Sequence, residues 1–269
     1  MSPKTYNYLA EYMSRLQSSG KYSFSWSELA RAFDCTDLAV KKSLHRQIRK
    51  GRLIALQREF YLVVPPEYSA KGILPPLLFI DDYMSFLQRP YYVGVLSAAA
   101  MHGAAHQQPQ EFYIVIQKPP KRRLSKKGVH LNFLVKNKLP VNGIVQKKTD
   151  TGSIKVSGPE LTAYDLVYYL ERTGGIVRCL SVLQELADTL DKYNLVSLAS
   201  EKSAMAPWQR LGYILEFVFD KTEAADALFD QLSARIHYRF PLDPGKEKRG
   251  FSSANRWKII QNRVIEAEI

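Results

Sequence analysis

The sequence offers few side-chain groupings that could do catalytic chemistry. His102 and His106 are four residues apart in "HGAAH", a spacing that can place two zinc ligands on one face of a helix. The glutamate of an H-E-x-x-H site is missing, and the sequence suggests no third ligand. Asp81 and Asp82 are adjacent and would lie on different faces of a helix, which is poor geometry for paired carboxylates. Ser97 lacks the G-x-S-x-G setting of an activated serine.

The chain also lacks common nucleotide-binding motifs, since it contains neither a P-loop nor a G-x-G-x-x-G sequence. We therefore expect a protein that is not an enzyme, with no catalytic residues, no metal and no cofactor. A metal-dependent nuclease stays open as an alternative, since a basic α+β domain could hold one. No acidic-acidic-lysine cluster follows a predicted strand, which disfavours it.

The clearest chemical pattern is basic and lies on one predicted helix, from about residue 37 to residue 50. Val40, Leu44 and Ile48 repeat on one face of that helix. At about 100° per residue the cations fall on the opposite side, where they could contact phosphates. The candidate DNA-binding residues on this helix and the hairpin after it are Lys41, Lys42, His45, Arg46, Arg49 and Arg58. Leu38 also falls on the basic side, which a phosphate-binding role does not explain.

The elements around this helix predict a winged helix-turn-helix in residues 1–65. Two helices precede it, and the second begins with capping-box spacing at Ser25 and Glu28. "LIAL" and "FYLVV" flank "QRE" and predict a hairpin with Arg58 at its tip. In the winged helix-turn-helix, the third helix enters the major groove of DNA. A winged helix that binds protein instead is the alternative.

Charge within this unit supports a nucleic-acid partner. Residues 1–60 hold eleven Lys/Arg against five Asp/Glu, and five of the eleven lie between residues 41 and 50. The whole chain of 269 residues has a formal net charge of +12. Such an excess favours an anionic partner, although charge alone does not choose between nucleic acid, membrane and acidic protein.

After the hairpin, "VVPPEYSAKGILPP" reads as an extended connector, so we place a domain boundary at about residues 65–75. Residues 76–269 are predicted to form a larger mixed α+β domain, with strands first and a helical C-terminal part. Within it, "GIVQKKTDTGSIKVSG" at 143–158 predicts a hairpin. Ser157 and Glu160 again have capping-box spacing before a helix. The predicted fold class is therefore α+β, with an N-terminal winged helix-turn-helix.

A second basic run, "KPPKRRLSKK" at 118–127, joins two predicted strands and is interpreted as a loop. It is either solvated and mobile, or a second contact with nucleic acid or a toxin. Its six cations are Lys118, Lys121, Arg122, Arg123, Lys126 and Lys127. Because exposed charges of one sign contribute little to folding, we expect that serine at 121, 122, 123, 126 and 127 leaves thermal stability nearly unchanged.

The compartment is suggested by what the sequence lacks. Its two cysteines, Cys35 and Cys179, give no disulfide framework. The N-terminus has no signal-type apolar core, and no apolar run reaches the roughly 18 residues of a spanning helix. We expect a soluble cytoplasmic protein without membrane contact.

Three segments resemble AbiEi-type antitoxins: "YYVGVLSAAAMHGAAHQQPQEFYIVI" at 91–116, "VSGPELTAYDLVYYLERTGGI" at 156–176 and "NRWKIIQNRV" at 255–264. In that family a winged helix precedes the antitoxin domain. The three segments occur here in the same order, behind a predicted winged helix, so the resemblance spans nearly the whole chain.

The resemblance implies two activities. The protein would repress its own operon by binding inverted repeats in promoter DNA, and it would counter a nucleotidyltransferase-like toxin. Such type IV pairs act in abortive infection against phage, and the antitoxin opposes the toxin's effect without needing a stable complex. We expect residues 1–65 to bind DNA and residues 76–269 to neutralise the toxin. A transcription regulator without an antitoxin role is the alternative.

Overall fold

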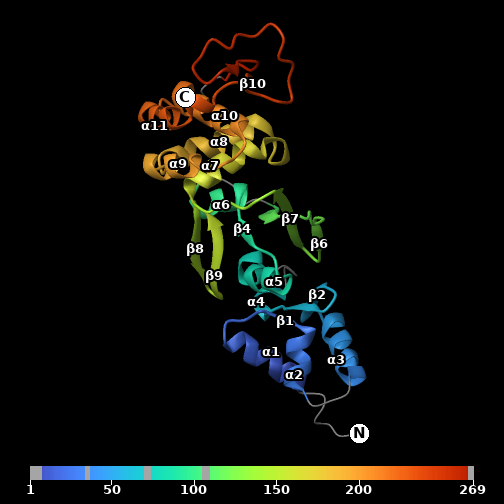
Figure 1. Cartoon of the computed structure of the whole chain (residues 1–269). Helices are drawn as coiled ribbons and strands as arrows, with labels where there is room; N and C mark the ends of the chain where they lie inside the picture. The colour runs from blue at the N-terminus through green and yellow to red at the C-terminus, as the bar shows by residue number, and fades with distance from the viewer. Residues whose placement is uncertain (1–7, 34–36, 70–73, 105–109, 266–269) are drawn as a thin grey trace. The chain divides into compact units, whose positions relative to one another are not determined.

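The computed structural model describes residues 8–33, 37–69, 74–104 and 110–265 (Figure 1). Helices and strands are both abundant, which confirms the mixed α+β class. The chain packs as two compact units. Unit 1 comprises residues 1–92, 114–137 and 146–155, and unit 2 comprises residues 93–113, 138–145 and 156–269. The boundary expected at about 65–75 falls inside unit 1, and a division of functions at that point stays a prediction.

The N-terminal part of unit 1 alternates helices with short strands. A three-stranded antiparallel sheet has the order β1-β3-β2, with β3 in the centre. The predicted capping box is present, since Ser25 and Glu28 bond to each other's backbone N–H. The elements are α1 (Tyr8–Ser18), β1 (Ser23–Ser25), α2 (Trp26–Ala32), α3 (Asp37–Arg49), β2 (Leu53–Gln57), β3 (Phe60–Val63) and α4 (Pro66–Ser69).

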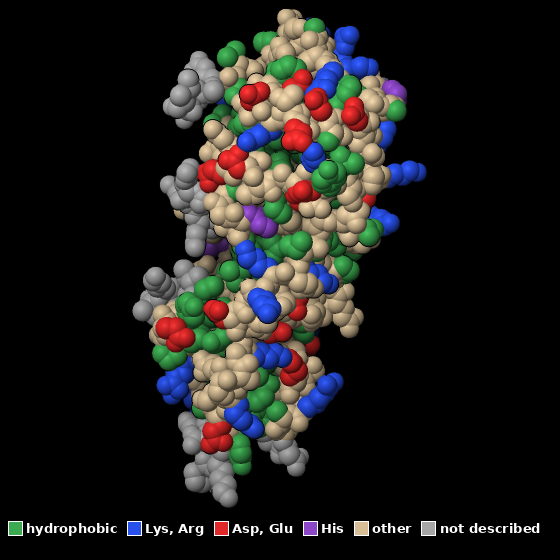
Figure 2. Space-filling model, turned by 90° about the vertical axis from the view of Figure 1, so that its left-hand side faces the viewer, with side chains coloured by type: hydrophobic (Ala, Val, Ile, Leu, Met, Phe, Trp, Pro, Cys, Tyr) green, Lys and Arg blue, Asp and Glu red, His purple; other side chains and the backbone are tan. Residues whose placement is uncertain are grey.

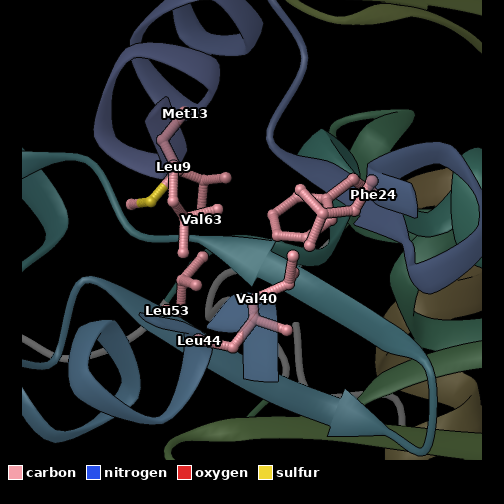
Figure 3. Close-up of a cluster of buried hydrophobic side chains, with 8 residues drawn as sticks. Leu9, Met13, Phe24, Val40, Leu44, Leu53 and Val63 are labelled. Carbon is pink, nitrogen blue, oxygen red and sulfur yellow. The ribbon is translucent and has the colours of Figure 1, made fainter. Parts of the chain in front are cut away.

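One apolar core holds these elements together (Figure 3). The amphipathic sides of α1 and α3 face the sheet, which supplies Phe24 and the ends of β2 and β3. The side chains of the core include Leu9, Met13, Phe24, Val40, Leu44, Leu53 and Val63. Because this core uses the apolar side of α3, the cationic side of that helix is left facing outward.

The sheet also packs on α5 (Ile80–Phe86), which lies beyond the proline-rich connector. The ring centroid of Phe60 lies 5.1 Å from that of Tyr83 and 5.0 Å from that of Phe86. Ser23 Oγ donates to Asp82 Oδ2 at 2.5 Å. The connector therefore does not separate residues 1–65 from the rest of unit 1.

A six-stranded sheet follows, with the order β6-β7-β5-β4-β9-β8. β4 and β9 pair in parallel at Val93 and Val156, and β6 pairs antiparallel with β7. The predicted hairpin at 144–157 is confirmed as β8 and β9. The strands are β4 (Tyr91–Val93), β5 (Phe112–Gln117), β6 (Leu124–Lys126), β7 (Val129–Lys136), β8 (Ile144–Thr149) and β9 (Gly152–Ser157).

The helices of unit 2 lie mainly after the sheet, as predicted. They are α6 (Val95–Met101), α7 (Pro159–Tyr168), α8 (Gly175–Ala187), α9 (Lys192–Ala199), α10 (Met205–Phe217) and α11 (Thr222–Leu232). Short 3-10 turns occur at Pro76–Leu78 in unit 1 and at Leu170–Arg172 and Ser233–Arg235 in unit 2. In the part of the chain that the structure describes, none of the helices is long and apolar enough to cross a membrane.

The second capping box was predicted wrongly. Helix α7 begins one residue later than the spacing suggested, with Gly158 as its N-cap and Pro159 in the first turn. Ser157 Oγ instead lies 2.6 Å from Thr162 Oγ1. Glu160 is buried and accepts the backbone N–H of Asp191 at 2.8 Å. Glu160 therefore connects two segments that are distant in sequence.

The C-terminal segment closes over α10 with two short parallel strands, β10 (Phe240–Pro241) and β11 (Ile259–Ile260). Trp257 is fully buried, and its Nε1 donates to Glu216 Oε2 at 2.6 Å. A Cβ at Gly212 would lie 2.2 Å from Trp257 Cη2. The motif "NRWKIIQNRV" therefore supplies a packing side chain that requires glycine on the facing helix.

Candidate nucleic-acid interface

Helix α3 presents a continuous cationic face. Lys42, His45 and Arg49 are exposed and recur at helical spacing, with Lys41 exposed beside them. Leu38 is 64% exposed on the same side, as the periodicity predicted. The opposite side of the helix is buried in the core described above. The structure thus brings together the cations that the sequence singled out on this helix.

The charges of this face are largely uncompensated within unit 1. Among the described residues, Lys42, His45 and Arg49 have no ion-pair partner. Lys41 Nζ lies 5.3 Å from the ring centroid of Trp26, a cation–π distance that holds this lysine against α2. Arg46 is half-buried at the edge of the face. Unpaired cations on a rigid helix suit the binding of a polyanion.

The hairpin of β2 and β3 adds a cation at its turn. The side chain of Arg58 is 92% exposed, and its Nε lies 3.6 Å from Glu59 Oε1. Such an exposed ion pair is weak, so Arg58 remains available to an anionic partner. Gln57, just before it, accepts a hydrogen bond from Tyr83 OH at 2.8 Å. The turn is therefore anchored to α5 of the same unit.

The second basic run is not the simple loop that was predicted. Leu124–Lys126 forms β6, an edge strand of the six-stranded sheet. Lys127 and Gly128 both have positive φ and make the tight turn into β7. The run is partly ordered because its backbone pairs with β7, a long-range contact that its local composition does not reveal.

Lys121 lies in the loop part of the run, as predicted, but its side chain is not fully solvated. It is half-buried, and its Nζ donates to Gln57 Oε1 at 3.2 Å. The Nζ also lies 5.7 Å from the ring centroid of Tyr83 and 5.6 Å from that of Phe133. Burial, with a smaller contribution from Arg89, lowers the pKa of Lys121. Nothing in the sequence marked Gln57 as the partner of this lysine.

These contacts predict that the basic run divides into a structural and a solvent-facing part. Lys121→Ser should lower the free energy of unfolding by about 1–2 kcal/mol, because it removes a hydrogen bond and two cation–π contacts. Arg122→Ser with Arg123→Ser should stay within about 0.5 kcal/mol, since both side chains are exposed. Urea unfolding measures both. Equal losses in the two variants would contradict the division.

The side chains considered for catalysis have structural partners. His102 Nε2 lies 2.7 Å from Ser157 O, and His106 lies outside the described residues. Asp81 accepts a hydrogen bond from Tyr91 OH at 2.8 Å, and Ser97 Oγ accepts the backbone N–H of Tyr113 at 2.9 Å. Within the described ranges, no three His, Cys, Asp or Glu side chains group in a way that could hold a metal ion.

Of the two cysteines, only Cys179 lies in the described part of the chain. Cys179 is a free, fully buried thiol on α8, and burial raises its pKa. Cys35 lies outside the described residues. An inert, buried thiol is a packing residue.

Net charge alone does not locate an interface. Figure 2 shows one face of the molecule, on which Lys and Arg side chains are spread out with Asp and Glu side chains among them. An interface is therefore indicated by the elements that align cations, above all by α3. The fold and this helix define a mixed α+β protein with a basic, outward-facing helix near its N-terminus.

Residues 92–217 match the family model of the AbiEi antitoxin C-terminal domain. This match confirms the resemblance to AbiEi-type antitoxins seen in the sequence. The matched range contains nearly all of the segment 91–116 and the whole of 156–176. The segment 255–264 and the N-terminal elements lie outside it.

Solved structures add information on the fold. The RV2827C protein from Mycobacterium tuberculosis is similar over 97% of this chain and 92% of its own, with a TM-score of 0.65 and 16% identity. At this identity the likeness shows a shared fold alone. An antigenic nucleotidyltransferase-like protein from Paracoccidioides brasiliensis gives a TM-score of 0.35 at 10% identity, covering 55% of this chain and 89% of its own, and carries no argument. No curated protein matches the sequence.

Proposed function

We propose that this protein is the antitoxin of a type IV toxin-antitoxin pair and acts in the cytoplasm. It would counter a nucleotidyltransferase-like toxin without catalysis of its own, in defence against phage. It would also repress its own operon by binding inverted repeats in the promoter. The match of residues 92–217 to the AbiEi antitoxin domain supports the first role.

The observation that carries the DNA-binding role is the outward face of α3. Its apolar side is used by the core, and its other side presents Lys42, His45 and Arg49 without ion-pair partners among the described residues. The order helix, strand, helix, helix and hairpin supports a winged helix-turn-helix. We infer that α3 enters the major groove and that Arg58 contacts a neighbouring phosphate. Arg46 and Arg49 are the candidates for reading guanine.

The second basic run is assigned to the same DNA surface in this proposal. Lys121 bonds Gln57, which directly precedes Arg58 at the hairpin turn. The exposed Arg122 and Arg123 follow Lys121 within the same compact unit. Their proximity to the hairpin favours DNA flanking the operator over the toxin as their partner. Lys118, Lys126 and Lys127 are exposed too and can add to this contact.

The experiment combines a promoter gel shift with growth rescue after toxin induction, both with the full chain. Truncation at residues 65–75 is avoided, because it would expose Phe60 and Tyr83. Promoter affinity should fall steeply with salt, with a slope of about 0.9 per phosphate neutralised. Affinity that is flat between low and physiological salt would exclude the DNA-binding role. Failure to rescue growth by a folded, DNA-binding protein would exclude the antitoxin role.

A further inference from the structure

The C-terminal segment, residues 235–263, is strongly basic and lies beyond the range matched by the antitoxin family. It holds eight Lys/Arg against two Asp/Glu. Three of its arginines are used inside unit 2. Arg235 donates to Ala199 O at 2.9 Å, Arg256 pairs with Glu216 and Asp226, and Arg263 pairs with Asp243. Lys258 donates to His237 O, which leaves four other cations in the segment.

These four cations are exposed, namely Arg239, Lys246, Lys248 and Arg249. Within the described part of the chain none of them has an ion-pair partner. Three lie together on the stretch 246–249, where like charges repel and oppose an ordered conformation. An anionic ligand would relieve that repulsion.

This loop is nevertheless held in place from inside. Asn262 is buried, and its Nδ2 donates to the backbone oxygens of Asp243, Lys246 and Glu247 at 2.8, 3.2 and 3.3 Å. Asp243 Oδ1 accepts the backbone N–H of Gly245 at 3.0 Å. The backbone of the loop is thus fixed by a buried polar network, while its cationic side chains are exposed.

Two exposed aromatic side chains belong to the same C-terminal segment. Tyr238 is 74% exposed and Phe251 is 49% exposed. They lie toward opposite ends of β11. Before the strand, Lys258 Nζ donates to His237 O at 3.5 Å, and after it the backbone N–H of Gln261 donates to Ser252 O at 2.9 Å. Solvent-exposed aromatic rings among cations favour a ligand with its own flat rings.

We propose that this surface, Arg239, Lys246, Lys248 and Arg249 with Tyr238 and Phe251, binds single-stranded nucleic acid. The cations would neutralise successive phosphates, and unpaired bases would stack on the two aromatic rings. A duplex keeps its bases stacked and cannot use those rings, so unpaired strands are preferred. Binding of this kind tolerates many sequences, because every base has an aromatic face.

Fluorescence anisotropy with a labelled 12-nucleotide oligo-U RNA and the full-length protein tests the proposal. Lys246→Ser, Lys248→Ser and Arg249→Ser together should weaken binding at least tenfold. The salt slope should fall by about 2, since each phosphate contact on a single strand contributes about 0.7. A matched control changes Arg172, Arg178 and Lys202 to serine. These are three exposed cations elsewhere in unit 2, and their loss should change affinity less than twofold.

Stacking is tested separately at Tyr238. Tyr238→Ala should weaken oligo-U binding by about 5- to 150-fold, whereas Tyr238→Phe should retain it, because the ring rather than the hydroxyl is used. A parallel measurement with oligo-dT distinguishes single-stranded RNA from single-stranded DNA as the ligand. Equal affinity for the two oligonucleotides would show that the site binds unpaired nucleic acid in general. Tighter binding of oligo-U would show that the site is specific for RNA and uses the 2′-hydroxyl.

Three results would overturn the proposal: no binding of either oligonucleotide at physiological salt, equal losses in the loop variant and its control, or an unchanged affinity in Tyr238→Ala. Thermal melting of each variant confirms that the fold persists. Independence from promoter binding is tested with Lys42→Glu combined with Arg49→Glu, which should weaken the promoter gel shift far more than oligo-U binding. Failure of one role can therefore be told from failure of the other.

Discussion

Lys42→Glu combined with Arg49→Glu should weaken promoter binding by about 100-fold at physiological salt. Each reversal replaces an attraction to phosphate by a repulsion, and a change of about 1.4 kcal/mol per site is a factor of ten in affinity. The salt slope should also fall by about 2. Both side chains are exposed, so thermal stability should change little. A gel shift over a salt series measures the effect.

The control for this variant is Arg15→Glu combined with Lys148→Glu. Both residues are exposed in unit 1 and lie away from α3 in sequence, on α1 and β8. The control changes the net charge by the same amount, so a purely global charge effect would weaken both variants equally. We expect the control to lose less than about threefold. Equal losses, or normal binding by the α3 variant, would contradict the interface.

Gly212→Ala should be the most destabilising small substitution in unit 2, with a loss of about 2–3 kcal/mol in the free energy of unfolding. In an isolated helix, Gly→Ala gains about 1 kcal/mol. Here the new Cβ would lie 2.2 to 2.4 Å from three ring atoms of Trp257. The indole cannot easily move, because it is fully buried and bonded to Glu216. Overpacking of this kind outweighs the gain in helix propensity.

A double-mutant cycle separates packing from other causes. Trp257→Phe removes the part of the indole that the new Cβ would meet. In that background, Gly212→Ala should cost at least about 1 kcal/mol less than in the original chain. Urea unfolding of the four proteins gives the coupling. Additive losses, or a stability gain from Gly212→Ala alone, would show that the close approach is not the cause.

The sequence determined the elements whose pattern is local. The amphipathic period of α3 predicted which side is buried and which carries cations, because an apolar stripe at 3.6-residue spacing must meet the core. The capping box of Ser25 and Glu28 was also predicted correctly. The hairpin at 144–157 could be predicted from its own alternation and turn residues. The antitoxin domain was recognised from its motifs.

Only the tertiary structure decided the features that depend on distant partners. β1, β4 and β6 have three residues each, too short for a periodic signal, and they exist as strands because neighbouring strands bond them. Glu160 serves Asp191 instead of its own helix end. Lys121 lies in a basic run, yet it is held by Gln57 from a strand more than sixty residues earlier. The residue type defines the chemistry of a side chain. The chain segments folded against that side chain decide whether its charge is exposed to solvent or bound to a partner.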